Sequence, residues 1–205
     1  MRCRLTHLGI AGLAVAALSM ATASAAAAKT VTKTATFNQC LGTSTPIPSN
    51  GSNAASINLP VPKNGKKIQS GIVTGVSAVG VRLTGRVGDF SLNLVSPGGV
   101  AISLAVERDG SGSGYGTGDA SCSGSLVQFT DGAATPISDP GNTVPNPIVG
   151  TFKPEQPLST FVGGPARGPW TLVVNDDSST RTGVLNAFSL NLTYTYKKPV
   201  KKKKK

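Results

Sequence analysis

The side chains that could carry out chemistry in this sequence are mostly carboxylates, hydroxyls and amines. Catalysis by a serine or cysteine nucleophile usually needs an imidazole that accepts and returns a proton. The only histidine is His7, which lies in a segment that we expect to be removed from the mature chain. Serines and lysines are frequent enough for Ser–Lys catalysis, but no pair of them stands out. We therefore expect a protein that is not an enzyme.

The carboxylates are the remaining candidates for a specific site. Asp89 follows a glycine at the start of a strand-like pattern, where an aspartate commonly accepts hydrogen bonds from the backbone of its own turn. The alternative is calcium, which prefers about six to eight oxygen ligands. The positive charge of Arg181 opposes a cation near the densest group of oxygens, residues 175–177. The possible calcium ligands are Asn175, Asp176, Asp177, Asp89 and, more weakly, Asp131.

The first residues indicate export. Arg2 and Arg4 precede an apolar stretch at 8–20, and small residues of the A-x-A type follow it. This is the pattern of a secretory signal peptide, which we expect to cover residues 1–28, with cleavage between 25 and 28. No second apolar stretch is long enough to cross a bilayer. The sequence therefore predicts a secreted, extracellular or cell-surface protein.

The mature chain would keep two cysteines, Cys40 and Cys122. In an exported chain, an even pair of cysteines most simply forms one disulfide bond. A metal site would need more ligands than two thiols supply. We therefore predict a disulfide between Cys40 and Cys122.

The net charge of +11 comes mainly from the C-terminus. The run 197–205 is rich in lysine and interrupted by a proline, so we expect a disordered arm, whereas residues 29–196 are close to neutral. The arm either only aids solubility or binds something anionic, such as a wall polymer, phospholipid headgroups, nucleic acid or an acidic polysaccharide. No aromatic residues are interleaved for base stacking, so we expect no specific nucleic-acid recognition. The lysines concerned are Lys197, Lys198, Lys201, Lys202, Lys203, Lys204 and Lys205.

Strands must position these residues, since the sequence contains no convincing amphipathic helix. Apolar and polar residues alternate at 90–94 and 188–194, which is the period of a strand with one buried face. A Pro-Gly-Gly turn at 97–99 leads into a second strand, which predicts a hairpin. We expect Trp170 in the core rather than on the surface as a sugar-stacking platform. The pattern predicts an all-β protein with an antiparallel β-sandwich.

We expect this sandwich to span residues 54–196. Before it, residues 29–53 would form an extended strand, with Val31 and Phe37 as candidates for burial, and then a loop at 43–53 rich in Ser, Thr, Pro, Gly and Asn. Inside the sandwich, 67–73 and 77–85 are predicted as separate strands.

Four segments, in this order, resemble the P domain (P/Homo B domain) of proprotein convertases and of bacterial subtilisin-like serine proteases. They are VGVRLTGRVGDFSLNLVSPGG (79–99), VQFTDGAA (127–134), FKPEQPLSTFVG (152–163) and GPWTLVVNDDSSTRTGVLNAFSLNL (168–192). The resemblance implies a jelly-roll-like, galactose-binding-like β-sandwich. It also raises the prospect of calcium, since P domains similar to this one can carry it. Two departures are Arg181, in a turn where the family tends to have G-D-x-G, and Phe188, where tryptophan is common.

The resemblance also bears on function, because a P domain usually follows a catalytic domain and none precedes it here. Our first hypothesis is a secreted, non-catalytic binding or stabilising module, held to anionic surfaces by its lysine arm. The second is an accessory domain that acts in trans with a separate subtilisin-like serine endopeptidase. The third is a cell-surface carbohydrate-binding or adhesion module. No cofactor is predicted apart from the possible calcium.

Overall fold

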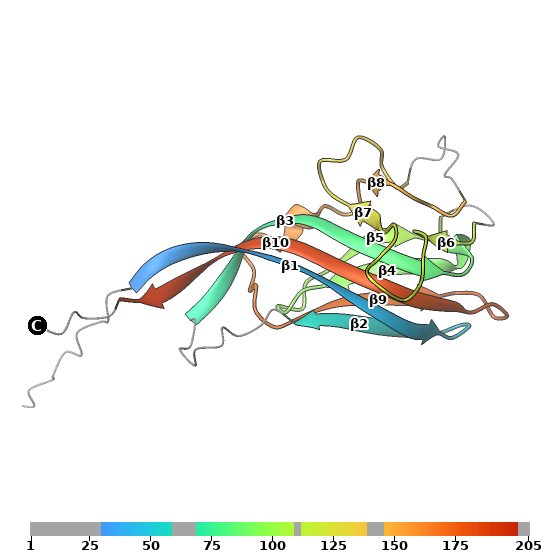
Figure 1. The fold of residues 1–205 in the computed structure, drawn as a ribbon, viewed down its shortest axis with the longest axis horizontal. Helices are drawn as coiled ribbons and strands as arrows, with labels where there is room; N and C mark the ends of the chain where they lie inside the picture. The colour runs from blue at the N-terminus through green and yellow to red at the C-terminus, as the bar shows by residue number, and fades with distance from the viewer. Residues whose placement is uncertain (1–29, 59–68, 109–111, 139–145, 201–205) are drawn as a thin grey trace, which may run out of the picture.

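The protein is a β-sandwich of two sheets packed face to face, as seen in a computed structural model (Figure 1). The residues that the structure describes are 30–58, 69–108, 112–138 and 146–200. Helical structure within them is limited to two short 3-10 turns, η1 (Val87–Asp89) and η2 (Leu158–Phe161), so none of their helices could span a membrane. The predicted all-β sandwich is confirmed. The jelly-roll arrangement stays a prediction.

The larger sheet has six strands in the order β1-β10-β3-β7-β8, with β6 also paired to β3. Its neighbours are antiparallel except for β7 and β8, which run parallel. The strands are β1 (Thr30–Ile47), β10 (Gly183–Pro199), β3 (Gln69–Thr84), β7 (Val127–Phe129), β8 (Thr151–Phe152) and β6 (Gly114–Tyr115).

The smaller sheet has four antiparallel strands in the order β2-β9-β4-β5. They are β2 (Ser52–Asn58), β9 (Pro169–Asp176), β4 (Phe90–Val95) and β5 (Ala101–Val106). The predicted hairpin is confirmed: β4 pairs with β5, and the backbone N–H of Ser96 donates to the carbonyl of Val100 at 2.8 Å.

The core lies between the sheets and follows the alternation of the sequence. On β4 the side chains of Phe90, Leu92 and Leu94 are buried, and on β10 those of Phe188, Leu190 and Leu192 are buried. Trp170, on β9, is fully buried, which confirms its predicted core position. Apolar burial of this extent is the main stabilising term for a sandwich.

The prediction of a loop at 43–53 was wrong. β1 continues to Ile47, which is buried in the core, and β2 begins at Ser52. The ladder between β1 and β10 shifts register between Gly42 and Thr45, and pairing resumes at Thr45. Composition favoured a loop here, but the ladder to β10 and the burial of Ile47 outweigh local propensity.

Residues 67–73 and 77–85 were wrongly predicted as separate strands. They fall in the single strand β3, whose ladder to β10 shifts register between Asn191 and Leu192 and between Thr193 and Tyr194. These irregularities let one strand continue through Gly75 without a break.

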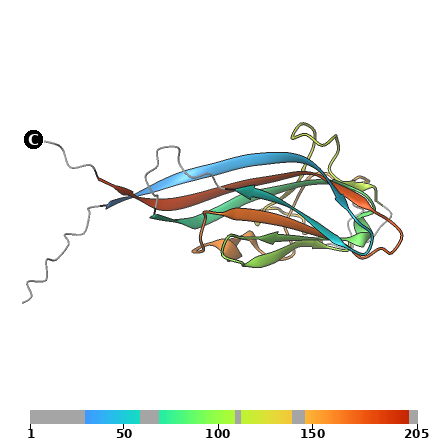
Figure 2. The same ribbon diagram turned by 90° about the horizontal axis from the view of Figure 1, so that it is seen from below.

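The expectation that Val31 is buried was also wrong. β1, β10 and β3 extend as a narrow end beyond the strands of the smaller sheet (Figures 1 and 2). With no strand of the smaller sheet opposite it, Val31 stays 42% exposed, whereas Phe37 is half-buried against the core. This three-stranded part is called the extension below.

The C-terminal arm begins later than predicted. Residues 197–199 belong to β10, where Lys197 pairs with Thr32 and Pro199 with Thr30. The ladder to β1 thus holds the first lysines of the run. The expected signal peptide, 1–28, and Lys201–Lys205 lie outside the described residues.

Candidate functional site

One polar cluster joins the turn before β4 to the turn between β9 and β10. Asp89 ends η1, and Arg181 lies in the β9–β10 turn, 92 residues later. Arg181 Nε donates to Asp89 Oδ2 at 2.7 Å and a terminal guanidinium nitrogen donates to Oδ1 at 3.3 Å. Arg86 Nε adds a weaker ion pair with Asp89 at 3.9 Å. We call Asp89, Arg181 and the neighbouring Asp176 the carboxylate–arginine junction.

The prediction that Asp89 caps its own turn was wrong. Both carboxylate oxygens bond the Arg181 side chain, and within the described residues no backbone N–H donates to them. The Arg181 guanidinium hydrogen-bonded to Asp89 holds the pKa of that carboxyl below its usual range. The backbone carbonyl of Asp89 also accepts the N–H of Asp177 at 3.0 Å, so main chain and side chain together hold the two turns side by side.

Asp176 is the second buried carboxylate of the junction. Its Oδ1 accepts the backbone N–H of Ser178 at 2.8 Å, whereas Oδ2 has no hydrogen-bond partner within the described residues. Burial raises the pKa of this carboxyl, with a smaller contribution in the same direction from the charge of Asp89. The junction therefore holds one carboxylate stabilised as an anion and one disfavoured as an anion.

The possible calcium ligands are brought together only in part: Asp89, Asp176 and Asp177 lie in the two adjoining turns, and Asp131 does not. Asp131 accepts the backbone N–H groups of Leu158 and Ser159 at 2.7 and 2.9 Å and so holds the start of η2. Asp89 is occupied by Arg181, and Asn175 is exposed on β9. Among residues 30–58, 69–108, 112–138 and 146–200, no three His, Cys, Asp or Glu side chains are grouped as metal ligands. These side chains do not fit one shared calcium site, and calcium stays an untested hypothesis.

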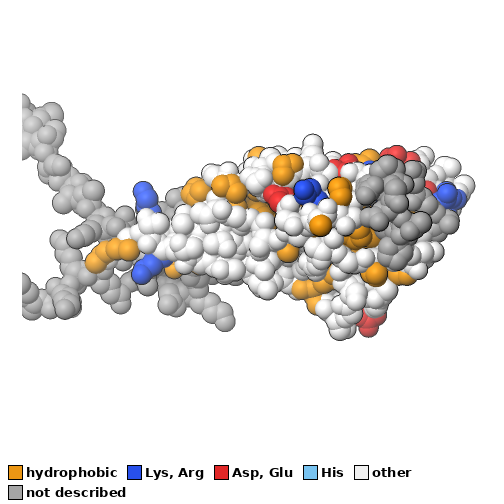
Figure 3. All heavy atoms as spheres, turned by 90° about the horizontal axis from the view of Figure 1, so that it is seen from above, with side chains coloured by type: hydrophobic (Ala, Val, Ile, Leu, Met, Phe, Trp, Pro, Cys, Tyr) orange, Lys and Arg blue, Asp and Glu red, His pale blue; other side chains and the backbone are white. Residues whose placement is uncertain are grey.

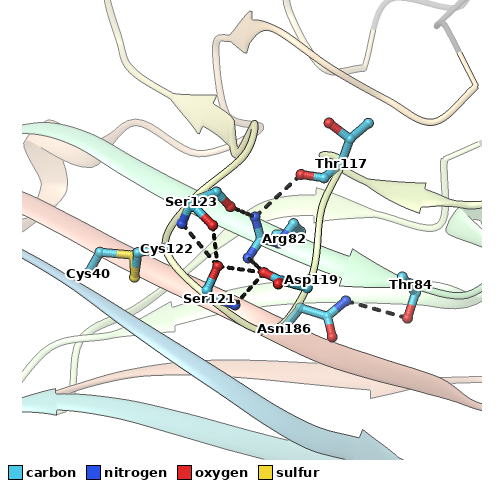
Figure 4. Close-up of polar contacts among 9 residues, drawn as sticks. All are labelled: Cys40, Arg82, Thr84, Thr117, Asp119, Ser121, Cys122, Ser123 and Asn186. Atoms are coloured by element: carbon cyan, nitrogen blue, oxygen red, sulfur yellow. Dashed lines mark hydrogen bonds and ion pairs between the residues drawn. A yellow bond between two sulfur atoms is a disulfide. The ribbon is translucent and has the colours of Figure 1, made fainter.

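A second cluster, around Arg82, was missed by the sequence reasoning. Arg82 lies on β3 between the inward-facing Val81 and Leu83, so alternation predicts an exposed side chain, yet it is fully buried. The Gly- and Ser-rich segment 117–124 covers it: one Nη1 atom donates to the carbonyls of Thr117, at 3.3 Å, and Ser123 (Figure 4). The exposed carboxylate of Asp119 lies 4.0 Å from Nη2.

The segment fits closely around the guanidinium because of its glycines. Gly118 and Gly124 have φ values of +115° and +91°, and a Cβ at either would lie 3.0 Å from the Arg82 Nη1 atom. Cys122, in the same segment, forms the predicted disulfide with Cys40 on β1, which is confirmed. In the sequence, Cys122 within the glycine-rich segment was the one indication that this segment is fixed to the sheet.

The family model described as "Proprotein convertase P-domain" matches residues 76–192, from within β3 into β10, and includes both polar clusters. The chain belongs to this family. Its P domain covers more than half of the sequence, and P domains are non-catalytic accessory domains of subtilisin-like proteases.

Among solved structures, this chain is similar to chains of a serine protease from Aeromonas sobria. One is the protease crystal structure and another is its complex with the chaperone ORF2; each has a TM-score of 0.44 and 14% identity. Each match covers 80% of this chain and 27% of the other, so this chain spans about a quarter of that protease's length. A search of curated proteins found no match.

The carboxylate–arginine junction predicts that the free energy of unfolding of this P domain depends on pH. A carboxyl whose pKa is lowered by folding stabilises the native state above its unfolded pKa, and this contribution is lost as pH falls through the folded pKa. For Asp89 the loss begins below about pH 5. We expect Asp89→Asn to have a smaller free energy of unfolding at pH 7 and a shallower decline between neutral and acid pH, measured by urea unfolding at several pH values.

The matched control for that prediction is Asp177→Asn. It removes the same charge from an exposed neighbour whose side chain makes no hydrogen bond or ion pair in the described residues. Equal pH profiles for the two variants would contradict the role of the Asp89–Arg181 pair.

The predicted anionic-surface residues are only partly within the described chain. Lys197 is exposed on β10, and Lys33 is exposed on β1, where it pairs with Tyr196. Basic side chains lie at the narrow end formed by the extension (Figure 3). Of Lys198 only the backbone is described. Lys33 was not among the predicted residues, because only the ladder between β1 and β10 brings it beside the C-terminal lysines.

Proposed function

We propose that this chain is a secreted, non-catalytic P domain that binds and stabilises a subtilisin-like serine protease present as a separate molecule. The observation that carries the proposal is the family match over residues 76–192. Members of this family are accessory modules of such proteases, so a protease is the partner for which the sandwich is best suited.

The chemistry of the described residues supports the non-catalytic part of the proposal. Residues 30–200 contain no histidine, and both of their cysteines are used in the disulfide. Neither an imidazole base nor a thiolate nucleophile is available from them. The strongest polar clusters, around Asp89 and Arg82, are used to hold turns and loops together.

The test is to mix the purified chain with subtilisin-like proteases from the secreted fraction of its own source. We expect one protease to co-purify and to keep its activity longer at elevated temperature when the P domain is present. The control is the P domain reduced and unfolded before mixing. No co-purification and an unchanged inactivation rate would refute the partner. Peptide cleavage by the purified chain alone would refute the non-catalytic assignment.

A second function, attachment to an anionic surface, is favoured by the exposed Lys33 and Lys197 at the end of the sheet from which the lysine run continues. Each lysine near an anionic membrane contributes about 1 kcal/mol, and the attraction falls off within a Debye length. We expect the full chain to be retained on anionic beads or cell walls at low salt and released at high salt.

The comparison for that prediction is a chain ending at Tyr196, together with a full-length variant whose lysines at 197–205 are replaced by glutamine. The glutamine variant keeps the length of the run and removes only its charge. Equal retention of all three proteins would exclude the lysine run as the attachment element.

A further inference from the structure

Two of the four strands that end the two sheets, β5 and β8, have outer edges that other described segments cover. The outer edge of β5 is bonded by Glu155 and Gln156: their backbone N–H groups donate to Leu104 and Ser103, and their side-chain oxygens accept the N–H groups of Val106 and Ser103. Such coverage stops another chain from adding to the sheet.

The outer edge of β8 is covered by another segment, whereas that of β2 is bonded only in part. Beyond β8, the Lys153 N–H donates to the Thr135 carbonyl at 2.8 Å, and Ile137 donates back to Lys153 at 2.9 Å. β2 has seven residues, and on it Asn53 Oδ1 accepts the N–H of Ala54 at 2.8 Å. Bonded N–H groups limit strand addition.

The outer edge of β1 is the longest of the four and is open over 31–39. Over 31–39 the strand pairs with β10 on one side, and on its other side no described residue donates to or accepts from its backbone. Every residue there is exposed or half-buried, and the strand lies along the outside of the extension (Figure 2). The stretch VTKTATFNQ has one charge, no proline and several β-favouring residues, so it carries few features that block an edge.

We propose that this edge pairs with the β1 edge of a second copy of the chain, antiparallel about a two-fold axis at Ala35. In that register the whole stretch 31–39 is paired, and Thr34 lies opposite Thr36 of the second copy, twice. Thr–Thr pairs across antiparallel strands are favourable. The larger sheets of the two copies would then form one continuous sheet, which is an isologous contact.

The side chains are compatible with self-pairing. Residues 31, 33, 35 and 37 lie on the same face as Leu192 and Tyr194 of β10. On this face the proposed register places Ala35 against Ala35 of the second copy and Val31 against Gln39. Lys33 would lie opposite Phe37, so no like charges meet. The stretch needs no oppositely charged partner, which favours a second copy over a differently charged protein.

The lysine run selects the antiparallel direction. Because Thr30 pairs with Pro199, the run leaves the sheet beside the start of β1. Antiparallel pairing places the two runs at opposite ends of the contact, roughly 30 Å apart at about 3.4 Å per residue. That separation exceeds the Debye length of about 8 Å at physiological salt, whereas parallel pairing would place the runs side by side.

The test is the mass of the purified full chain, by sedimentation equilibrium from low to high micromolar concentration. We expect a monomer–dimer equilibrium for the wild type. T34K/T36K sets lysine against lysine twice across the proposed axis and is expected to weaken the dimer roughly tenfold or more. T34K/T36E makes opposite-charge pairs at the same positions and should keep the dimer.

T74K is the control for an added charge, since Thr74 is exposed on β3 of the same sheet, away from β1. It should behave as the wild type, and thermal melts should show that all variants are folded. A35C should form an interchain disulfide in the dimer, because position 35 meets its own copy.

Several results would overturn the proposal. They are a wild type that stays monomeric throughout, T34K/T36K and T34K/T36E dimers of equal strength, or a dimer in which A35C does not cross-link. A monomer whose β1 amides become protected from hydrogen exchange only when a subtilisin-like protease is added would also overturn it. That result would assign the edge to a strand of the protease.

Discussion

The variant C40S/C122S is expected to lose about 4 kcal/mol of the free energy of unfolding, on the chain-entropy account of disulfides. The bond joins residues 82 positions apart, so it removes a large loop-closure entropy from the unfolded chain. The measurement is the urea midpoint of wild type and variant, followed by circular dichroism. Wild type in reductant should match the variant, which separates the bond from the serine substitutions.

A local effect should accompany that loss. Cys122 lies between Ser121 and Ser123, and the Ser123 carbonyl accepts a hydrogen bond from the buried Arg82 (Figure 4). Without the disulfide, segment 117–124 is held by its hydrogen bonds to Arg82 and by the backbone pairing of Thr117 with Ser125. We expect hydrogen exchange in this segment to become faster in the variant than in the wild type. The increase should be larger than in β4, which the disulfide does not touch. An unchanged midpoint together with unchanged exchange would contradict both expectations.

Trp170→Ala is expected to destabilise the protein by about 3–5 kcal/mol, in the range found for removal of large buried aromatic side chains. The indole is fully buried, its Nε1 donates to the Ala166 carbonyl at 2.9 Å, and its ring meets Phe161 edge to face with centroids 5.1 Å apart. Truncation leaves a cavity and an unpaired carbonyl at once.

The control for that prediction is Trp170→Phe. It keeps an aromatic ring against Phe161 but loses the Nε1 donor and some volume, so we expect a smaller loss, about 1–2 kcal/mol. Both are read from urea unfolding by circular dichroism, because Trp170 is the only tryptophan and fluorescence disappears with it. A Trp170→Ala midpoint equal to the wild type would mean that the core does not depend on the indole.

Much of the sandwich could be predicted because strand patterning is local. The alternation of apolar residues predicts which face of a strand is buried. The structure confirms this for Phe90, Leu92 and Leu94 and for Phe188, Leu190 and Leu192. The hairpin at 97–99 follows from turn residues between two such patterns. The disulfide followed from cysteine number and expected export, and the P-domain family from the order of four segments.

The candidate sites were predicted less well, because they depend on residues far apart in the chain. Asp89 was correctly singled out, but its partner Arg181 lies 92 residues later and was read only as an obstacle to calcium. Asp131 was predicted as a weaker calcium ligand from its residue type, whereas it holds the start of η2. A carboxylate's role is set by which cation or N–H group the fold brings to it.

The sequence alone determined the strand faces, the disulfide pair, the core position of Trp170 and the family. Only the tertiary structure decided that Arg82 is buried, that Val31 is exposed and that β1 has an open edge. The physical reason is that the alternation of apolar and polar residues predicts which face of its strand a side chain occupies. It does not predict what covers that face. A loop fixed by a distant cysteine covers Arg82, and the smaller sheet ends before it reaches Val31.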